Sequence, residues 1–128
     1  MTTQIERDKI VTLYRPVGPE ELALIKETQF QKFPPRLFHQ PIFYPVTNLE
    51  YAEQIARDWN VPASGSGFVT QFDIESDYLN QFPIQNVGGM IHNEYWIPAE
   101  QLEEFNSHIV GEIKIIREFY AEKNDSRT

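Results

Sequence analysis

Alternation of apolar and polar residues predicts the strands of this chain. Over residues 10–15 the alternation places Val11, Leu13 and Arg15 on one face, and the run ends at Pro16. Comparable β-branched and aromatic runs predict further strands over residues 41–46, 68–74, 93–97 and 111–119. The strands are therefore expected along the whole chain rather than in one half of it.

Helical periodicity predicts a first helix directly after the first strand. Pro19 is a favourable first helical residue, and Glu20 and Glu21 suit the positive end of the helix dipole. The apolar side of this helix is expected to carry Leu22, Ile25 and Gln29.

A second helix is predicted behind the strand over residues 41–46. Thr47 and Glu50 have the spacing of a capping box. The residues that recur at i, i+3, i+4 and i+7 behind it are Ala52, Ile55, Ala56 and Trp59. We therefore predict that Trp59 lies in the core. A flexible Ser/Gly turn is expected over residues 62–67, and a short helical turn over residues 99–105.

These interspersed elements define the expected fold class. The pattern favours an α+β fold with mixed, largely antiparallel short-stranded sheets and two main helices over a doubly wound parallel sheet. The chain has 128 residues, 41% of them hydrophobic, which fits one domain with one core. We expect this domain to span residues 1–128, with the core over residues 10–120 and polar tails on both sides, the C-terminal one over residues 124–128.

Composition and charge narrow the partners. The formal net charge is −8 and no basic cluster is present, so duplex nucleic acid is not an expected partner. The chain has no cysteine, which removes disulfides and thiolate chemistry and suits a reducing compartment. Residues 1–9 are unlike a secretory signal, and no apolar run approaches the ~20 residues that cross a bilayer. We predict a cytoplasmic protein that does not enter a membrane.

Several common catalytic and binding motifs are missing. His39, His92 and His108 match no metal-ligand spacing, so no metal site is predicted. Ser64 and Ser66 lie in a turn without the strand–turn–helix context of a hydrolase nucleophile. No glycine-rich phosphate loop of the dinucleotide-binding or P-loop type follows a predicted strand.

Three charged residues leave two interpretations open. Arg15 continues an otherwise apolar strand face, and Glu94 opens a short aromatic strand with His92 and Trp96 on the same face. Both residues carry chemistry in a cleft, or Arg15 caps the edge of the sheet and Glu94 points to solvent. The second interpretation is favoured, because most charged residues at strand ends are solvated. Arg36 either clamps a phosphate or sits on a surface loop, and the second interpretation is favoured.

Three short motifs follow one another along the chain. They are Leu13-Tyr14-Arg15, then Phe43-Tyr44-Pro45-Val46 leading into Glu50-Tyr51-Ala52, then His92-Asn93-Glu94-Tyr95-Trp96-Ile97-Pro98. In this order they resemble the ADP-ribosyltransferase superfamily, which has an Arg or His at the end of its first core strand, a Ser/Thr- or Tyr-bearing strand that runs into a helix, and a Glu on a third strand. A closer resemblance, over Leu13–Gly18, Phe33–Arg36, Gln40–Val46 and Glu94–Glu100, is to small bacterial proteins that carry the label "ADP-ribosylation/crystallin J1".

The resemblance implies an ADP-ribosyltransferase-like fold and NAD as the substrate. Glu94 matches the superfamily Glu and would stabilise the oxocarbenium-like state formed when the nicotinamide–ribose bond breaks. Arg15 matches the first motif and would grip the pyrophosphate with its planar fork. Tyr44 or Trp96 would stack on the nicotinamide. The catalytic residue is then Glu94, and the expected nucleotide-binding set is Tyr14, Arg15, Tyr44, His92 and Trp96.

Two departures from the superfamily pattern leave a second function open. The middle motif has Phe43-Tyr44-Pro45 in place of Ser-Thr-Ser, and His92 stands where arginine-modifying members have Glu or Gln. The acceptor of an ADP-ribose group is therefore not specified. The alternative to an NAD-cleaving enzyme is a catalytically inactive binding or interaction module on the same fold.

Overall fold

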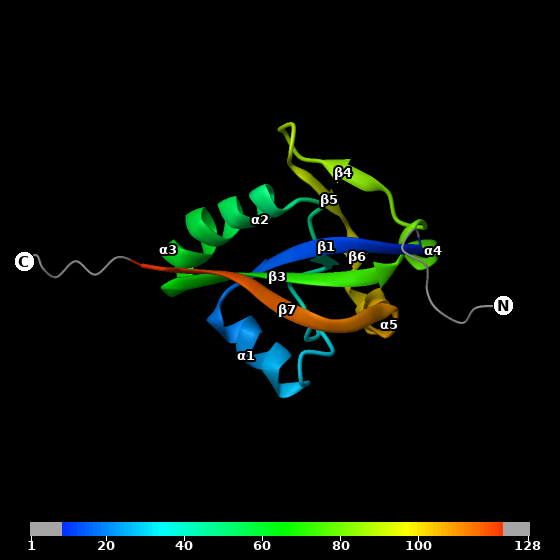
Figure 1. Cartoon of the computed structure of the whole chain (residues 1–128), viewed down its shortest axis with the longest axis horizontal. Coiled ribbons are helices and arrows are strands. Elements are labelled where there is room, and N and C mark those ends of the chain that lie inside the picture. The colour runs from blue at the N-terminus through cyan, green and yellow to red at the C-terminus, as the bar shows by residue number, and fades with distance from the viewer. Residues whose placement is uncertain (1–8, 122–128) are drawn as a thin grey trace, which may run out of the picture.

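The fold is built around a three-stranded antiparallel sheet whose middle strand is β3 (Ser66–Glu75) (Figure 1). Strand β1 (Ile10–Val17) pairs with one side of β3, and β7 (Ile109–Tyr120) pairs with the other. The computed structural model describes residues 9–121, which form a mixed α+β structure with small antiparallel sheets and few helices, as the sequence predicts. Strands β3 and β7 are longer than predicted because they pair with each other along most of their length.

Two short sheets lie beside the main one. They are formed by β2 (Ile42–Phe43) with β6 (Ile97–Pro98), and by β4 (Ile84–Asn86) with β5 (Asn93–Tyr95). Val46 connects the β4–β5 sheet to the main sheet, because it forms one antiparallel bridge with Tyr14 of β1 and another with Glu94 of β5. The three sequence motifs therefore lie side by side, although they are far apart along the chain.

The larger core lies on one face of the main sheet. Helix α1 (Pro19–Glu27) contributes Leu22 and Ile25 to it, as the periodicity predicts. Gln29 does not share this side, because the helix ends at Glu27 and the backbone of Gln29 is left-handed, with φ 58°. Further core residues come from α4 (Ser76–Leu79), and from α5 (Leu102–Ser107), which follows the short turn η3 (Ala99–Gln101).

A continuous helical segment packs against a second core cluster. It consists of α2 (Leu49–Ile55), the π-helical turn η2 (Ala56–Asn60) and α3 (Val61–Ser64). Its N-cap is Asn48, whose side-chain oxygen accepts from the Tyr51 N–H at 2.8 Å, so the predicted cap at Thr47 is wrong. Asn48 is favoured because its amide also donates to the Ile91 carbonyl at 2.6 Å and ties the helix start to the segment before β5.

The prediction that Trp59 lies in the core is wrong, since its side chain is 73% exposed. In η2 the N–H of Val61 donates to the carbonyl of Ala56, five residues earlier. Pro62 has no N–H and its ring conflicts with a regular preceding turn, which a π turn relieves. The wider turn rotates Trp59 away from the apolar side. The predicted flexible turn over residues 62–67 is replaced by α3, the left-handed Gly65 (φ 88°) and the start of β3.

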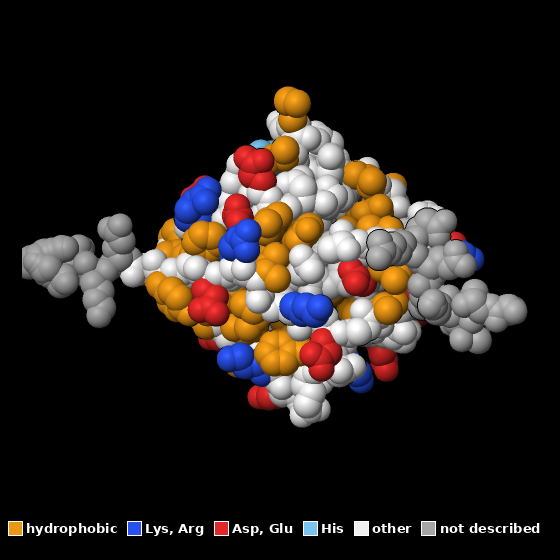
Figure 2. Space-filling model, in the orientation of Figure 1, with side chains coloured by type: hydrophobic (Ala, Val, Ile, Leu, Met, Phe, Trp, Pro, Cys, Tyr) orange, Lys and Arg blue, Asp and Glu red, His pale blue; other side chains and the backbone are white. Residues whose placement is uncertain are grey.

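The surface, the helices and the chain ends add three observations. On the face drawn in Figure 2, acidic and basic side chains are interspersed. No helix within residues 9–121 is long and apolar enough to cross a membrane. The predicted polar tail over residues 124–128 lies outside the described residues.

Candidate functional site

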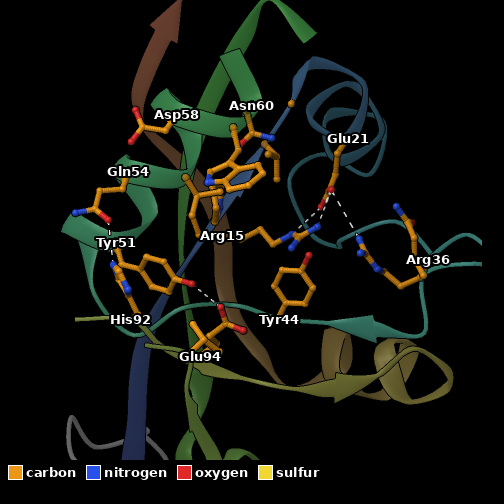
Figure 3. Close-up of a pocket in the computed structure, with 17 residues that line it drawn as sticks. Arg15, Glu21, Arg36, Tyr44, Tyr51, Gln54, Asp58, Asn60, His92 and Glu94 are labelled. Atoms are coloured by element: carbon orange, nitrogen blue, oxygen red, sulfur yellow. Dashed lines mark hydrogen bonds and ion pairs between the residues drawn. The ribbon is translucent and has the colours of Figure 1, made fainter. Parts of the chain in front are cut away.

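A cavity of about 750 Å³ opens where β1 separates from the segment that carries Tyr44. The bridge between Tyr14 and Val46 joins these two backbones, and beyond it both contribute side chains to the cavity walls. The other walls come from the start of α1, from α2 with η2, and from β5 (Figure 3). The cavity therefore lies where the three sequence motifs meet.

Arg15 lies at one end of this cavity and binds Glu21. Its Nε and Nη2 atoms donate to the two carboxylate oxygens of Glu21 at 3.0 and 2.8 Å, a bidentate ion pair. The guanidinium carbon lies 4.9 Å from the ring centroid of Phe43, and 8% of the side chain is exposed. Thr70, opposite Arg15 on β3, donates its hydroxyl to the Arg15 carbonyl at 2.8 Å and fixes the backbone. The interpretation of Arg15 as a solvated residue is therefore wrong.

Arg36 approaches the same carboxylate from another side (Figure 3). Its Nη1 atom lies 4.0 Å from Oε1 of Glu21, and 10% of its side chain is exposed, so the favoured surface-loop interpretation is wrong. Burial, and after it the positive charge of Arg15, lowers the pKa of Arg36, although a guanidinium stays protonated. Its Nε atom is buried and has no hydrogen-bond partner within the described part of the chain.

Glu94 is buried in another part of the cavity wall. The Tyr51 hydroxyl donates to its Oε2 at 2.6 Å, and the indole Nε1 of Trp96 donates to its Oε1 at 2.8 Å. Burial, and then this hydrogen bond to Glu94, raises the pKa of Tyr51, so the phenol keeps its proton and remains a donor. The interpretation of Glu94 as a solvated residue is wrong, because 7% of the residue is exposed.

His92 supports this carboxylate indirectly. Its ring centroid lies 4.5 Å from that of Tyr51, and its Nε2 lies 3.1 Å from Oε1 of Gln54 on α2. Gly89 makes room for the imidazole, since a Cβ atom there would lie 2.6 Å from Nδ1 of His92. The predicted grouping of His92 and Trp96 around Glu94 therefore holds, with Tyr51 between His92 and the carboxylate.

Two exposed aromatic rings border the cavity. Tyr44 is 41% exposed, and Trp59 lies in the π turn. Asn60, next to Trp59, lines the same wall, and its Oδ1 atom is buried without a hydrogen-bond partner among residues 9–121. The rings offer flat surfaces on which a planar ligand can stack, and Asn60 offers an unused acceptor.

The predicted site residues divide into three groups. Arg15, Tyr44, His92 and Glu94 line the cavity. Trp96 is not part of the lining but holds Glu94. Tyr14 packs against the second core cluster, under helix α2. Alternation along β1 places its side chain on the face opposite to that of Arg15.

The sequence analysis missed three residues of the site: Glu21, Tyr51 and Asn60. From the sequence, Glu21 is explained by the helix dipole alone, although Glu21 lies only six residues after Arg15 and pairs with it. Tyr51 belongs to the second of the three motifs, but the motif assigns it no function. Asn60 gave no signal in the sequence, because only the π turn places it at the cavity.

Comparison of the chain with protein-family models, with curated proteins and with solved structures finds no match. The resemblance to the ADP-ribosyltransferase superfamily therefore rests on the sequence motifs and stays a prediction. Within residues 9–121, no group of three His, Asp or Glu side chains is placed to hold a metal ion. The site offers paired guanidiniums, a buried carboxylate and exposed aromatic rings around one cavity.

Proposed function

We propose that this cavity binds NAD⁺ and that Glu94 assists cleavage of the bond between nicotinamide and its ribose. The observation that carries the proposal is that Arg15 and Glu94 are both buried and line one cavity. The volume of about 750 Å³ is within the roughly 300–1,000 Å³ common for small-molecule sites. Tyr44 lines the same cavity with an exposed ring.

Each of these residues has a task in the proposed reaction. Arg15 binds the diphosphate, and Tyr44 stacks on a planar ring of the ligand. The bond from C1′ to the nicotinamide nitrogen breaks with both electrons leaving on nicotinamide, and positive charge develops on the ribose. The carboxylate of Glu94 stabilises that charge, held in one orientation by Tyr51 and Trp96. Water then adds to C1′ and loses a proton, which gives ADP-ribose.

A second candidate function is nucleotide binding without catalysis. Both carboxylate oxygens of Glu94 already accept hydrogen bonds, and the guanidinium of Arg15 is already paired with Glu21. Hydrogen-bonded and ion-paired groups of this kind also stabilise a folded cavity without any reaction, so their arrangement does not depend on catalysis. This observation favours a binding module.

Glu94→Gln separates the two functions. A glutamine can accept from Trp96 through its oxygen and donate to the Tyr51 hydroxyl through its amide, so the variant is expected to fold. We expect millimolar NAD⁺ to stabilise the wild type and Glu94→Gln by about 1–3 kcal/mol in a thermal melt. Nicotinamide release should fall by about 100-fold or more in Glu94→Gln.

The exposed Glu112→Gln is the matched control and should behave as the wild type in both assays. Stabilisation by NAD⁺ without nicotinamide release from the wild type would select the binding module. A wild type whose melting temperature is unchanged by NAD⁺, ADP-ribose and nicotinamide would contradict both functions.

A further inference from the structure

Two guanidinium groups share one carboxylate at the Arg15 end of the cavity. Glu21 accepts a bidentate pair from Arg15, and the same Oε1 atom lies 4.0 Å from Arg36. No other carboxylate within residues 9–121 lies within 4.0 Å of either guanidinium. Taken by themselves, these three side chains carry a net charge of +1, and the other two carboxylates that line the cavity, Asp58 and Glu94, are not within 4.0 Å of either guanidinium.

This surplus charge is largely removed from water. The side chains of Arg15 and Arg36 are 8% and 10% exposed. A buried charge without a counter-charge is unfavourable, and the lowered pKa of Arg36 reflects the same two causes, burial and the neighbouring Arg15. The buried Nε atom of Arg36 also lacks a hydrogen-bond acceptor in the described part of the chain. The net positive charge favours an anion here, and the Nε–H of Arg36 can donate to an oxygen of that anion.

The position of the cluster makes it accessible to a ligand. Arg15, Glu21 and Arg36 all line the cavity. Glu21 lies in the first turn of α1, and its carboxylate has hydrogen bonds only from Arg15 among residues 9–121. The carboxylate of Glu21 can therefore rotate away from Arg15 without breaking any other side-chain hydrogen bond. A carboxylate and a phosphate offer a guanidinium the same pair of oxygens, so one can replace the other.

We propose that Arg15 and Arg36 form a binding site for a phosphate-type oxyanion, a diphosphate in particular, and that Glu21 is the resident counter-ion which this ligand displaces. The ligand places oxygens on both guanidiniums and gives the Nε atom of Arg36 an acceptor. Glu21 competes with it, so the carboxylate lowers affinity and excludes weakly charged ligands. The proposal rests on the proposed function only in that both use Arg15, and it adds Arg36 and Glu21 to the site.

Titration with inorganic pyrophosphate tests this site without NAD⁺. Binding is measured by calorimetry at constant ionic strength, with chloride replacing pyrophosphate in the reference. We expect Arg36→Gln to weaken binding by about tenfold or more, because it removes a charge-assisted hydrogen bond. Arg36→Lys keeps the charge but not the fork and should lie between Arg36→Gln and the wild type.

Glu21→Gln gives the sharper result, because the expected effect is a gain. Removal of the competing carboxylate should strengthen pyrophosphate binding by about fivefold or more. The exposed residues Arg117 and Glu112 provide matched controls, and Arg117→Gln and Glu112→Gln should change the affinity less than twofold. ADP-ribose identifies the source of the anion: tighter binding than pyrophosphate indicates the diphosphate of a nucleotide, and equal binding indicates the free anion.

Three results would overturn the proposal: no preference of the wild type for pyrophosphate over chloride, an equal loss in Arg36→Gln and Arg117→Gln, or weaker binding by Glu21→Gln. These outcomes are separable from those for the proposed function. Pyrophosphate binding without NAD⁺ binding would remove NAD⁺ and leave the anion site. NAD⁺ binding that is unchanged by Arg36→Gln and Glu21→Gln would remove the anion site and leave the proposed function.

Discussion

The Arg15 and Glu94 regions of one cavity hold buried charge in opposite ways. Around Arg15, charged groups meet charged groups, and the positive ones are in excess. Around Glu94, a single carboxylate is held by two neutral donors, Tyr51 and Trp96, and has no ion-pair partner among the described residues. In the Arg15 region the excess of positive charge is what the proposed oxyanion would neutralise, whereas in the Glu94 region two neutral donors hold one carboxylate in a single orientation.

Removal of Arg15 is expected to have the largest effect on this comparison. Arg15→Met leaves Glu21 with Arg36 alone, at 4.0 Å. Deletion of one partner of a buried ion pair costs several kcal/mol, and because Arg36 can move closer we expect a loss of about 3 kcal/mol in the free energy of unfolding. Urea denaturation measures this loss. The double variant Arg15→Met/Glu21→Leu should recover most of it, and a loss below about 1 kcal/mol in the single variant would class the pair with weak surface ion pairs.

Tyr51→Phe makes the corresponding change in the Glu94 region and should cost less. It removes the 2.6 Å hydrogen bond to the buried carboxylate and leaves Trp96 as its donor. Hydrogen bonds to charged groups contribute about 1.5–3 kcal/mol, and we expect a loss of about 2 kcal/mol in urea denaturation. Tyr78→Phe is the matched control, because the Tyr78 hydroxyl is buried without a partner and its removal should be neutral or slightly stabilising. Equal losses in the two variants would show that the hydrogen bond to Glu94 does not contribute.

Alkaline pH should weaken the Glu94 region through Tyr51. The pKa of Tyr51 is raised in the folded protein above the ordinary value of 10.0, so the folded state keeps a proton that the unfolded chain releases. The resulting stability is complete below pH 10 and is lost as the pH rises further, by at most about 1.4 kcal/mol per pH unit. The stability difference between the wild type and Tyr51→Phe, measured from pH 9 to 11, should therefore narrow by about 1 kcal/mol. A constant difference would contradict the assignment.

Trp59→Ala should have the smallest effect on stability. The ring is 73% exposed, so we expect a change of less than about 0.5 kcal/mol, far below the roughly 3–5 kcal/mol of a buried tryptophan. If Trp59 stacks on the ligand, nucleotide binding should nevertheless weaken by about threefold to tenfold. Phe43 lies in the core next to Arg15, so Phe43→Ala is expected to lose much more stability than Trp59→Ala. A large loss of stability in Trp59→Ala would mean that the ring packs more than its exposure indicates.

Strand β1 and helix α1 were predictable because their residues alternate between a buried and an exposed side, whereas β4 was not predicted and the strand expected over residues 41–46 is only the two-residue β2. Leu13 and Arg15 share one face of β1, and Leu22 and Ile25 share one side of α1, as periodicity alone requires. The prediction for Trp59 failed because it assumed a regular 3.6-residue repeat, whereas Pro62 sits behind a π turn. Local periodicity is reliable only while the backbone keeps one helical geometry.

The site was partly predictable from the motifs. Arg15, Tyr44, His92 and Glu94 were chosen from sequence and line the cavity. The favoured solvent interpretation of Arg36 failed because a proline-containing loop has no period from which burial can be read. Glu21 and Tyr51 could not be assigned because their partners are distant in sequence or on another element.

The sequence by itself determined the fold class, the position of most strands and helices, and which residue types could bind an anion or stabilise a positive charge. These follow from local properties: side-chain alternation, helical periodicity, and the chemistry of each side chain. The tertiary structure decided which of these side chains are buried and which pair with one another. Val46 brings β1 and β5 together, and the π turn places Trp59 and Asn60 at the cavity. Burial and pairing depend on contacts between residues far apart in the chain, which no local pattern records.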